Sequence, residues 1–230
     1  TLIKGPIEQL EQNFDEKMSM ETVKMIRRNA NRVLNMVNQL LDLSKFDEGS
    51  LKLTPTEGDV FKCIRAATSS FNSHAAQRDI DYKVQIPQEV LWASFDRGKL
   101  ENIIYNLLGN AFKFSEDGSE ISFIASFETH GLQILVSDTG RGIPEEKLLY
   151  IFDRFYQAAR EDYSYQNRDQ QIGEGTGIGM ALTKELVNFF NGTINIESQV
   201  DQGTTFKLRL PIIRQAPKII EDHIPEINSP

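Results

Sequence analysis

Residues 96–115 limit the possible folds most strongly, because they combine a helical apolar stripe with polar groups on one face. The apolar side chains recur at helical spacing, and Asp96 is placed to cap the start of the helix. They are Leu100, Ile103, Ile104, Leu107 and Leu108. Asn106 and Asn110 share a face, with Lys113 a turn further on. Amide oxygens can ligate Mg²⁺ and an ammonium can meet a phosphate oxygen, although ordinary surface residues would give the same pattern.

Two glycine-rich segments follow. The first, Asp138 to Pro144, comes after a strand-like run. The second, residues 173–182, has a glycine at every second position up to Gly179 and leads into an apolar helix expected over 178–190. Backbone N–H groups in a glycine-rich approach to a helix N-terminus form an anion site. Either segment alone is weak evidence for a nucleotide site, since flexible loops use the same residues.

The order of the three motifs is specific. The Asn-bearing helix, the Asp-x-Gly-x-Gly segment and the Gly-x-Gly-x-Gly segment resemble an ATP-binding domain. It is the domain shared by sensor histidine kinases, gyrase-type ATPases, the heat-shock chaperone ATPase and the mismatch-repair ATPase. Residues 151–156, Ile-Phe-Asp-Arg-Phe-Tyr, resemble the phenylalanine box of the histidine kinases in particular. The resemblance extends from about Asp96 to Pro211.

This resemblance implies a site for ATP and Mg²⁺. Asp138 would accept a hydrogen bond from the exocyclic amine of adenine, where guanine has a carbonyl oxygen. The residues implied beside the base are Gly140, Gly142, Ile143, Phe114 and, on a weaker match, Thr205. Those implied around the triphosphate are Lys113, Gly173, Gly175, Thr176, Gly177, Ile178 and Gly179, and those implied for the metal are Asn106 and Asn110. Phe114 stands where many family members have a tyrosine, so a hydroxyl is missing there.

Residues 151–156, called the aromatic box from here on, and the segment after them each allow two interpretations. Phe152, Phe155 and Tyr156 fit an apolar core at least as well as a functional role. Arg154 fits either a contact with the γ-phosphate or a surface salt bridge. Residues 157–172 have no clear period, and we interpret them as a lid over ATP, with a disordered linker as the alternative.

Residues 1–48 predict a helical hairpin. Apolar residues follow heptad spacing from Ile3 to Phe14 and from Val23 to Leu40, with a polar link at 15–19. Two narrow stripes bury each other poorly, so we expect a homodimer through a four-helix bundle. The alternative is an intramolecular hairpin packed on the main domain.

The hairpin resembles the dimerisation and phosphoacceptor hairpin of histidine kinases. In that family the acceptor histidine lies just upstream of the residues that match Thr1 to Leu10. None of His74, His130 and His223 lies in such a context, and we interpret all three as surface residues. We therefore expect a fragment of a longer protein, with the acceptor histidine upstream of Thr1.

Residues 49–213 predict the catalytic domain. A helix is expected over 59–77, and strands over 51–55, 80–86, 90–95, 120–127, 133–137, 193–198 and 204–210, the last four forming two hairpins. The fold class is α+β: the helical hairpin, then an α/β sandwich with a mixed sheet and helices over one face. Residues 214–230 contain three prolines and are interpreted as a tail or linker.

Composition and resemblance together define the expected function. The net charge of -8 argues against direct nucleic-acid binding, and the lone Cys63 cannot form an internal disulfide. The resemblance implies the cytoplasmic kinase core of a membrane-anchored bacterial sensor. It would transfer the γ-phosphoryl of ATP to a histidine and then to a response-regulator receiver domain.

Two alternatives are an ATPase of the same fold and a nucleotide-binding dimerisation module without kinase activity. Hydrolytic members of the fold supply a glutamate base on the Asn-bearing helix. Here Asn106 precedes Leu107, and Glu101 lies more than a turn away, which disfavours hydrolysis.

Overall fold

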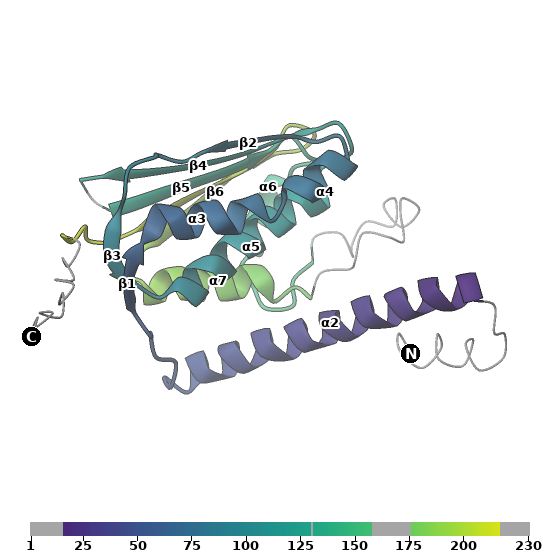
Figure 1. Cartoon of the computed structure of the whole chain (residues 1–230), viewed down its shortest axis with the longest axis horizontal. Coiled ribbons are helices and arrows are strands. Elements are labelled where there is room, and N and C mark those ends of the chain that lie inside the picture. Colours follow the sequence, from purple (N-terminus) through teal and green to yellow (C-terminus); the bar gives the residue numbers. More distant parts are fainter. Residues whose placement is uncertain (1–15, 130, 158–175, 217–230) are drawn as a thin grey trace, which may run out of the picture.

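The computed structural model describes residues 16–129, 131–157 and 176–216. Its first element is the long helix α2, Glu16–Asp47 (Figure 1). The polar link expected at 15–19 is wrong over residues 16–19, which are helical, because Glu, Lys and Met favour helix and no proline or glycine interrupts them. The expected partner helix lies outside the described residues. None of the described helices has the length and apolar character that crossing a membrane requires.

A five-stranded mixed sheet forms one layer of the domain (Figure 1). The strands, in spatial order, are β2 (Asp81–Gln85), β4 (Glu120–Glu128), β5 (Gly131–Asp138), β7 (Gly203–Leu210) and β6 (Thr193–Gln199). Strand β2 runs parallel to β4, and the other neighbours are antiparallel. Both predicted hairpins, β4 with β5 and β6 with β7, are confirmed. A separate two-stranded sheet pairs β1 (Thr56–Asp59) with β3 (Trp92–Phe95).

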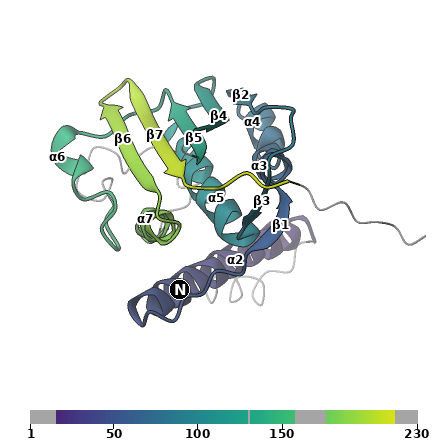
Figure 2. The ribbon, with the colours of Figure 1, turned by 90° about the vertical axis from the view of Figure 1, so that its left-hand side faces the viewer.

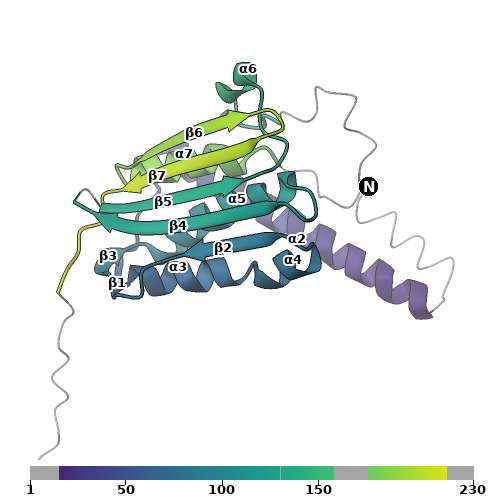
Figure 3. The ribbon, with the colours of Figure 1, turned by 90° about the horizontal axis from the view of Figure 1, so that it is seen from above.

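Helices cover one face of the five-stranded sheet (Figures 1 and 3). They are α3 (Val60–Ser69), the short α4 (Asn72–Gln77), α5 (Arg97–Phe114) and α7 (Gly179–Phe189). The short helix α6 (Glu145–Leu148) lies beside the edge strand β6 (Figures 2 and 3). The predicted stripe of α5 is fully buried at 0% exposure, and it faces alternate buried residues of the central strands. The predicted sandwich is confirmed. Helix α2 lies on the far side of the helical layer from the sheet (Figure 2).

The strand expected at residues 51–55 is wrong. The first strand begins at Thr56, because the preceding segment bonds to a side chain rather than to a neighbouring strand. Thr54 donates to Asp96 Oδ2 through its backbone nitrogen at 2.9 Å and through its hydroxyl at 3.1 Å. Asp96 also caps α5 as predicted, since its Oδ1 accepts from Lys99 N at 3.0 Å.

The single helix expected over 59–77 is two helices, α3 and α4. The break falls at Ser70 and Phe71, between the two helices. The Ser70 hydroxyl donates to the Ala67 carbonyl at 2.7 Å and so competes with the helical ladder. The ring of Phe71 stacks on Phe112, with centroids 5.2 Å apart, which holds the turned chain against α5.

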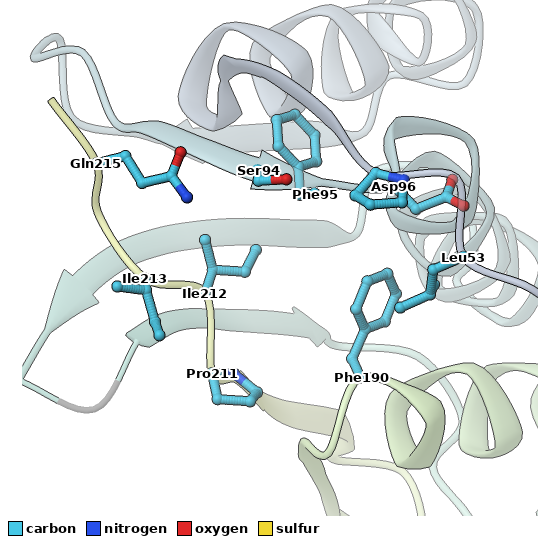
Figure 4. Close-up of a pocket in the computed structure, with 10 residues that line it drawn as sticks. Leu53, Ser94, Phe95, Asp96, Phe190, Pro211, Ile212, Ile213 and Gln215 are labelled. Carbon is cyan, nitrogen blue, oxygen red and sulfur yellow. The ribbon is translucent and has the colours of Figure 1, made fainter. Parts of the chain in front are cut away.

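A small cavity lies where the chain leaves β7 (Figure 4). Its volume is about 210 Å³, and Leu53, Phe190 and Ile212 contribute to its walls. Gln215 lies at its rim, and its backbone nitrogen donates to the Trp92 carbonyl at 2.7 Å. Residues predicted to start the tail therefore still contact the domain. The cavity lies at the opposite end of β7 from the strand end that pairs with Asp138.

Candidate nucleotide site

The carboxylate of Asp138 ends strand β5 and is 8% exposed. Its Oδ1 accepts a hydrogen bond from Gly140 N at 2.9 Å, and the backbone N–H of Thr204 is a second donor. Burial raises the pKa of this carboxyl to about 6, while the two backbone donors act in the opposite direction. A buried carboxylate with such support can accept one more hydrogen bond from a ligand amine.

Gly140 and Gly142 let the chain turn closely around Asp138. A Cβ at Gly140 would lie 2.4 Å from the Phe114 carbonyl oxygen and 2.9 Å from Asp138 Oδ1. Gly142 has φ +66°, and a Cβ there would lie 1.9 Å from the Gln199 carbonyl oxygen. Neither position accepts a side chain without backbone movement, which agrees with the predicted need for glycine.

Ile143, predicted beside the base, has its backbone fixed by the neighbouring hairpin. Its backbone N–H donates to Ser198 Oγ at 2.8 Å, and its side chain packs partly buried against the core. The described geometry therefore keeps Ile143 next to the Asp138 turn. A contact between its side chain and a base stays a prediction.

Thr204, rather than Thr205, lies beside Asp138. In the ladder between β5 and β7, Asp138 pairs with Thr204, and Thr205 pairs with Ser137. Alternation along a strand turns Thr205 to the other face of the sheet, where its Oγ1 lies 2.7 Å from Ser137 Oγ. Two adjacent threonines give no local signal that separates them, so sequence reasoning missed Thr204.

Asn106 joins α5 to the start of α7. Its Nδ2 donates to the carbonyl oxygen of Gly179 and to Thr183 Oγ1, each at 3.2 Å. The carbonyl can only accept, so the amide nitrogen faces α7 and Oδ1 remains the group able to meet a cation. Asn110 lies one turn further along the same face, half-buried. The described residues contain no group of three His, Cys, Asp or Glu that could hold a metal ion.

Cations gather around Phe114 at the end of α5. Lys113 Nζ lies 5.0 Å from the ring centroid, and the Arg141 Cζ lies 4.5 Å from it. Arg141 N also donates to the Phe114 carbonyl at 3.3 Å. Arg141 was not among the predicted site residues, although it stands between the two glycines of the Asp138 segment.

Four predicted phosphate residues surround the start of α7. Thr176 Oγ1 accepts from Ile178 N at 3.2 Å, and Ile178 is fully buried. Gly177 O accepts from Phe155 N at 2.9 Å, and Gly179 meets the Asn106 amide. The structure thus brings Thr176 to Gly179 together with Asn106. Gly173 and Gly175, like most of the predicted lid, lie outside the described residues.

The aromatic box divides between core and surface. Phe152 and Tyr156 pack partly buried against the core, whereas Phe155 is 59% exposed with φ +64°. Arg154 forms a two-pronged ion pair with Asp47 at the end of α2, with both N···O distances 2.6 Å. The salt-bridge interpretation of Arg154 holds in this structure, and its partner lies 107 residues away in the sequence.

Other candidate reactive groups are engaged elsewhere. Glu101 accepts from Arg97 Nε at 2.8 Å and from the Cys63 thiol at 3.8 Å. Burial raises the pKa of that thiol to about 11. His74 is exposed and stacks on Phe112 with centroids 5.2 Å apart. His130 and His223 lie outside the described residues.

Comparison with protein-family models decides the family. The model of the histidine kinase-, DNA gyrase B- and HSP90-like ATPases matches residues 95–214, which include Asn106, Asp138 and Gly179. The chain belongs to this ATPase family. The family is described as ATPases, which agrees with the ATP site predicted from the sequence.

Curated relatives within the family are sensor kinases. The sensor histidine kinase TmoS of Ectopseudomonas mendocina is 36% identical over 92% of this chain. The sensor protein kinase WalK of Staphylococcus epidermidis is 32% identical over 96% of it. The chain spans only 21% and 35% of these two relatives. The predicted resemblance to the catalytic domain of sensor histidine kinases is confirmed.

Solved structures share the fold. Full-length ShkA in complex with AMPPNP has a TM-score of 0.72 at 19% identity, over 94% of this chain and 43% of that one. The histidine kinase ThkA in complex with the response regulator protein TrrA has a TM-score of 0.66 at 20% identity, over 92% and 57%. These structural similarities show that the fold is shared. At such sequence identities they do not assign roles to individual residues.

Proposed function

We propose that this chain is the ATP-binding kinase core of a sensor histidine kinase within a longer, membrane-anchored protein. The observation that carries the proposal is the buried Asp138 carboxylate, held by backbone donors in a turn that only glycine can form. The amine of adenine would be the missing donor. Thr204, beside Asp138 in the ladder, is the better candidate than Thr205 for a hydroxyl near the base.

The triphosphate is proposed to lie at the start of α7. Backbone N–H groups there favour an anion, and the positive end of the helix dipole adds to the attraction. Lys113, within a turn of Asn110, would supply a cation from α5. Gly173 and Gly175 are proposed to extend the same anion site.

Asn106 and Asn110 are the proposed protein ligands of Mg²⁺. Asn106 fits, because its nitrogen is committed to α7 and its oxygen is the free acceptor of that amide. When bound, the ion supplies charge neutralisation to the phosphates. The residues of the chain itself orient the nucleotide, and positioning is the main contribution expected in phosphoryl transfer.

The proposed reaction is transfer to histidine. An imidazole nitrogen attacks the γ-phosphorus, the bond to the β,γ-bridging oxygen breaks, and ADP leaves. The phosphoryl group would pass on to an aspartate of a response-regulator receiver domain, a partner type suggested by the printed name of the ThkA complex. Hydrolysis is disfavoured because Glu101 is paired with Arg97 rather than directed at the site.

Helix α2 is proposed to form part of a homodimer interface. Apolar side chains along it stay exposed to solvent in the single chain, which a second copy would cover. They are Val23, Val33, Leu34, Val37, Leu40 and Leu41. This agrees with the heptad spacing, because Val23, Val33, Val37 and Leu40 belong to the predicted seam.

A labelling experiment tests the kinase proposal. The chain extended upstream to include the expected acceptor histidine is incubated with γ-labelled ATP and Mg²⁺. We expect label on the protein that is lost in acid and kept in base, as for a phosphoramidate. Release of labelled phosphate without protein label would favour the ATPase alternative, and neither product would favour the dimerisation module.

A further inference from the structure

Helix α2 contacts the catalytic domain through its last turns. The Phe46 ring packs edge-on against Phe189, with centroids 5.4 Å apart, and Lys99 Nζ lies 3.3 Å from Asp42 Oδ2. Earlier in the helix, Val33 and Leu34 are exposed. The docked part of α2 is therefore the segment 39–47, and it lies along α7, from Thr176 before that helix to Phe189 at its end.

The carboxylate of Asp47 binds the Arg154 guanidinium in the same two-pronged way that a phosphate group can. Both prongs of the guanidinium are used, each at 2.6 Å from one carboxylate oxygen. Guanidinium groups bind carboxylate and phosphate oxygens through the same parallel pair of N–H bonds. Arg154 precedes Phe155, whose amide donates to Gly177 O at 2.9 Å, so the backbone that carries Arg154 is held next to the start of α7.

Gln39, about two turns before Asp47 in α2, makes a second contact, and this one lies at the start of α7. Thr176 Oγ1 lies 3.2 Å from Gln39 Oε1 and donates to it, and the same Oγ1 accepts from Ile178 N at 3.2 Å. The Thr176 side chain thus covers an N–H group of the proposed phosphate site while α2 holds that side chain in place. Two phosphate-seeking groups, one cationic and one backbone, are occupied when α2 is docked.

We propose that segment 39–47 of α2 competes with the nucleotide phosphates for Arg154 and for the Ile178 N–H. The inference rests on the proposed function, because it needs the triphosphate at the start of α7. Linkage makes the competition reciprocal: phosphates weaken the Asp47 and Gln39 contacts of α2, and loss of those two contacts strengthens ATP binding. The ion pair is half-exposed on both sides, so it is weak enough to be reversible.

Affinity for two ligands tests the competition. A non-hydrolysable ATP analogue with Mg²⁺ and adenosine are each titrated calorimetrically into the unsubstituted chain and into Asp47→Asn. We expect the substitution to tighten ATP-analogue binding about threefold to fivefold, the largest factor that an exposed ion pair supplies. Adenosine lacks phosphates, so its affinity should not change. Gln39→Ala should give a smaller gain in the same direction.

Two further variants separate competition from a general loosening of α2. In an Arg154→Gln background, Asp47→Asn should have no effect, because the contested group is gone. Asp42→Asn breaks the Lys99 pair on the same helix but leaves Arg154 engaged, and we expect no gain. An unchanged or weaker ATP affinity in Asp47→Asn, or an equal gain in Asp42→Asn, would overturn the inference. If the unsubstituted chain binds no nucleotide, the proposed function itself fails.

Discussion

Gly140 N lies 2.9 Å from Asp138 Oδ1, so a backbone amide two residues on supports a carboxylate that burial disfavours. The same close turn leaves no room for a Cβ at Gly140. A single short segment therefore builds an acceptor, holds it in place and lets a flat ligand approach. The cost is a carboxyl group whose ionised form is unfavourable in the absence of a ligand.

This cost predicts how stability depends on pH. The folded pKa of Asp138 is about 6, above its ordinary value of 3.8, so the folded state keeps the proton longer than the unfolded state. Stability should fall as pH rises from about 4 to about 6, by roughly 3 kcal/mol when no ligand is bound. Urea unfolding of the chain and of Asp138→Asn measures this. The variant should lack that decrease, and parallel profiles would contradict the assignment.

Nucleotide binding should show the opposite trend. The ionised carboxylate is the better acceptor for the adenine amine, so affinity for the ATP analogue should weaken as pH falls through about 6. The loss should approach about tenfold between pH 7 and pH 5, with proton release on binding near pH 6. Titrations in buffers of different ionisation enthalpy measure both. A flat affinity profile would show that Asp138 does not meet the ligand.

Asn106 and Asn110 should respond differently to alanine. Asn106→Ala removes two hydrogen bonds to α7, so the free energy of unfolding should fall by about 1–2 kcal/mol. Asn110→Ala should change it by less than about 0.5 kcal/mol. Both should reduce the Mg²⁺-dependent part of ATP-analogue affinity. If magnesium enhances binding equally in both variants and in the unsubstituted chain, neither amide is a ligand.

Gly142 and Gly109 offer a matched pair of glycines. Gly142→Ala introduces a Cβ 1.9 Å from Gln199 O at φ +66°, and should destabilise the chain by about 2–4 kcal/mol. Gly109 lies within α5 with no atom within 4 Å of its Cβ position. Gly109→Ala should therefore stabilise it by about 0.5–1 kcal/mol. Thermal unfolding of both variants measures the difference, and similar shifts would contradict the described turn.

Features set by local periodicity could be predicted from the sequence. The stripe of α5, its Asp96 cap and both hairpins depend on spacing within one segment, and all agree with the structure. The motif order also identified the family correctly. The break at Ser70 was missed because the apolar pattern continues through it. The stack of Phe71 on Phe112 is a tertiary contact, which the local sequence does not reveal.

Pairings between distant segments could not be predicted. The Arg154 and Asp47 pair joins positions 107 apart, and the choice of Thr204 over Thr205 depends on the register of β7 against β5. No local pattern encodes either. Arg141 was missed for a different reason, since the family motif leaves its position free while the structure brings it over Phe114.

The most direct test of the central claim is a calorimetric titration with non-hydrolysable ATP and GTP analogues in the presence of Mg²⁺. Asp138→Asn is compared with the unsubstituted chain, and Asp81→Asn, an exposed aspartate of β2, is the control. We expect the ATP analogue to be preferred, and its affinity to drop about tenfold to a hundredfold in Asp138→Asn alone. Equal binding of both analogues, or unchanged ATP affinity in Asp138→Asn, would contradict an adenine site at Asp138.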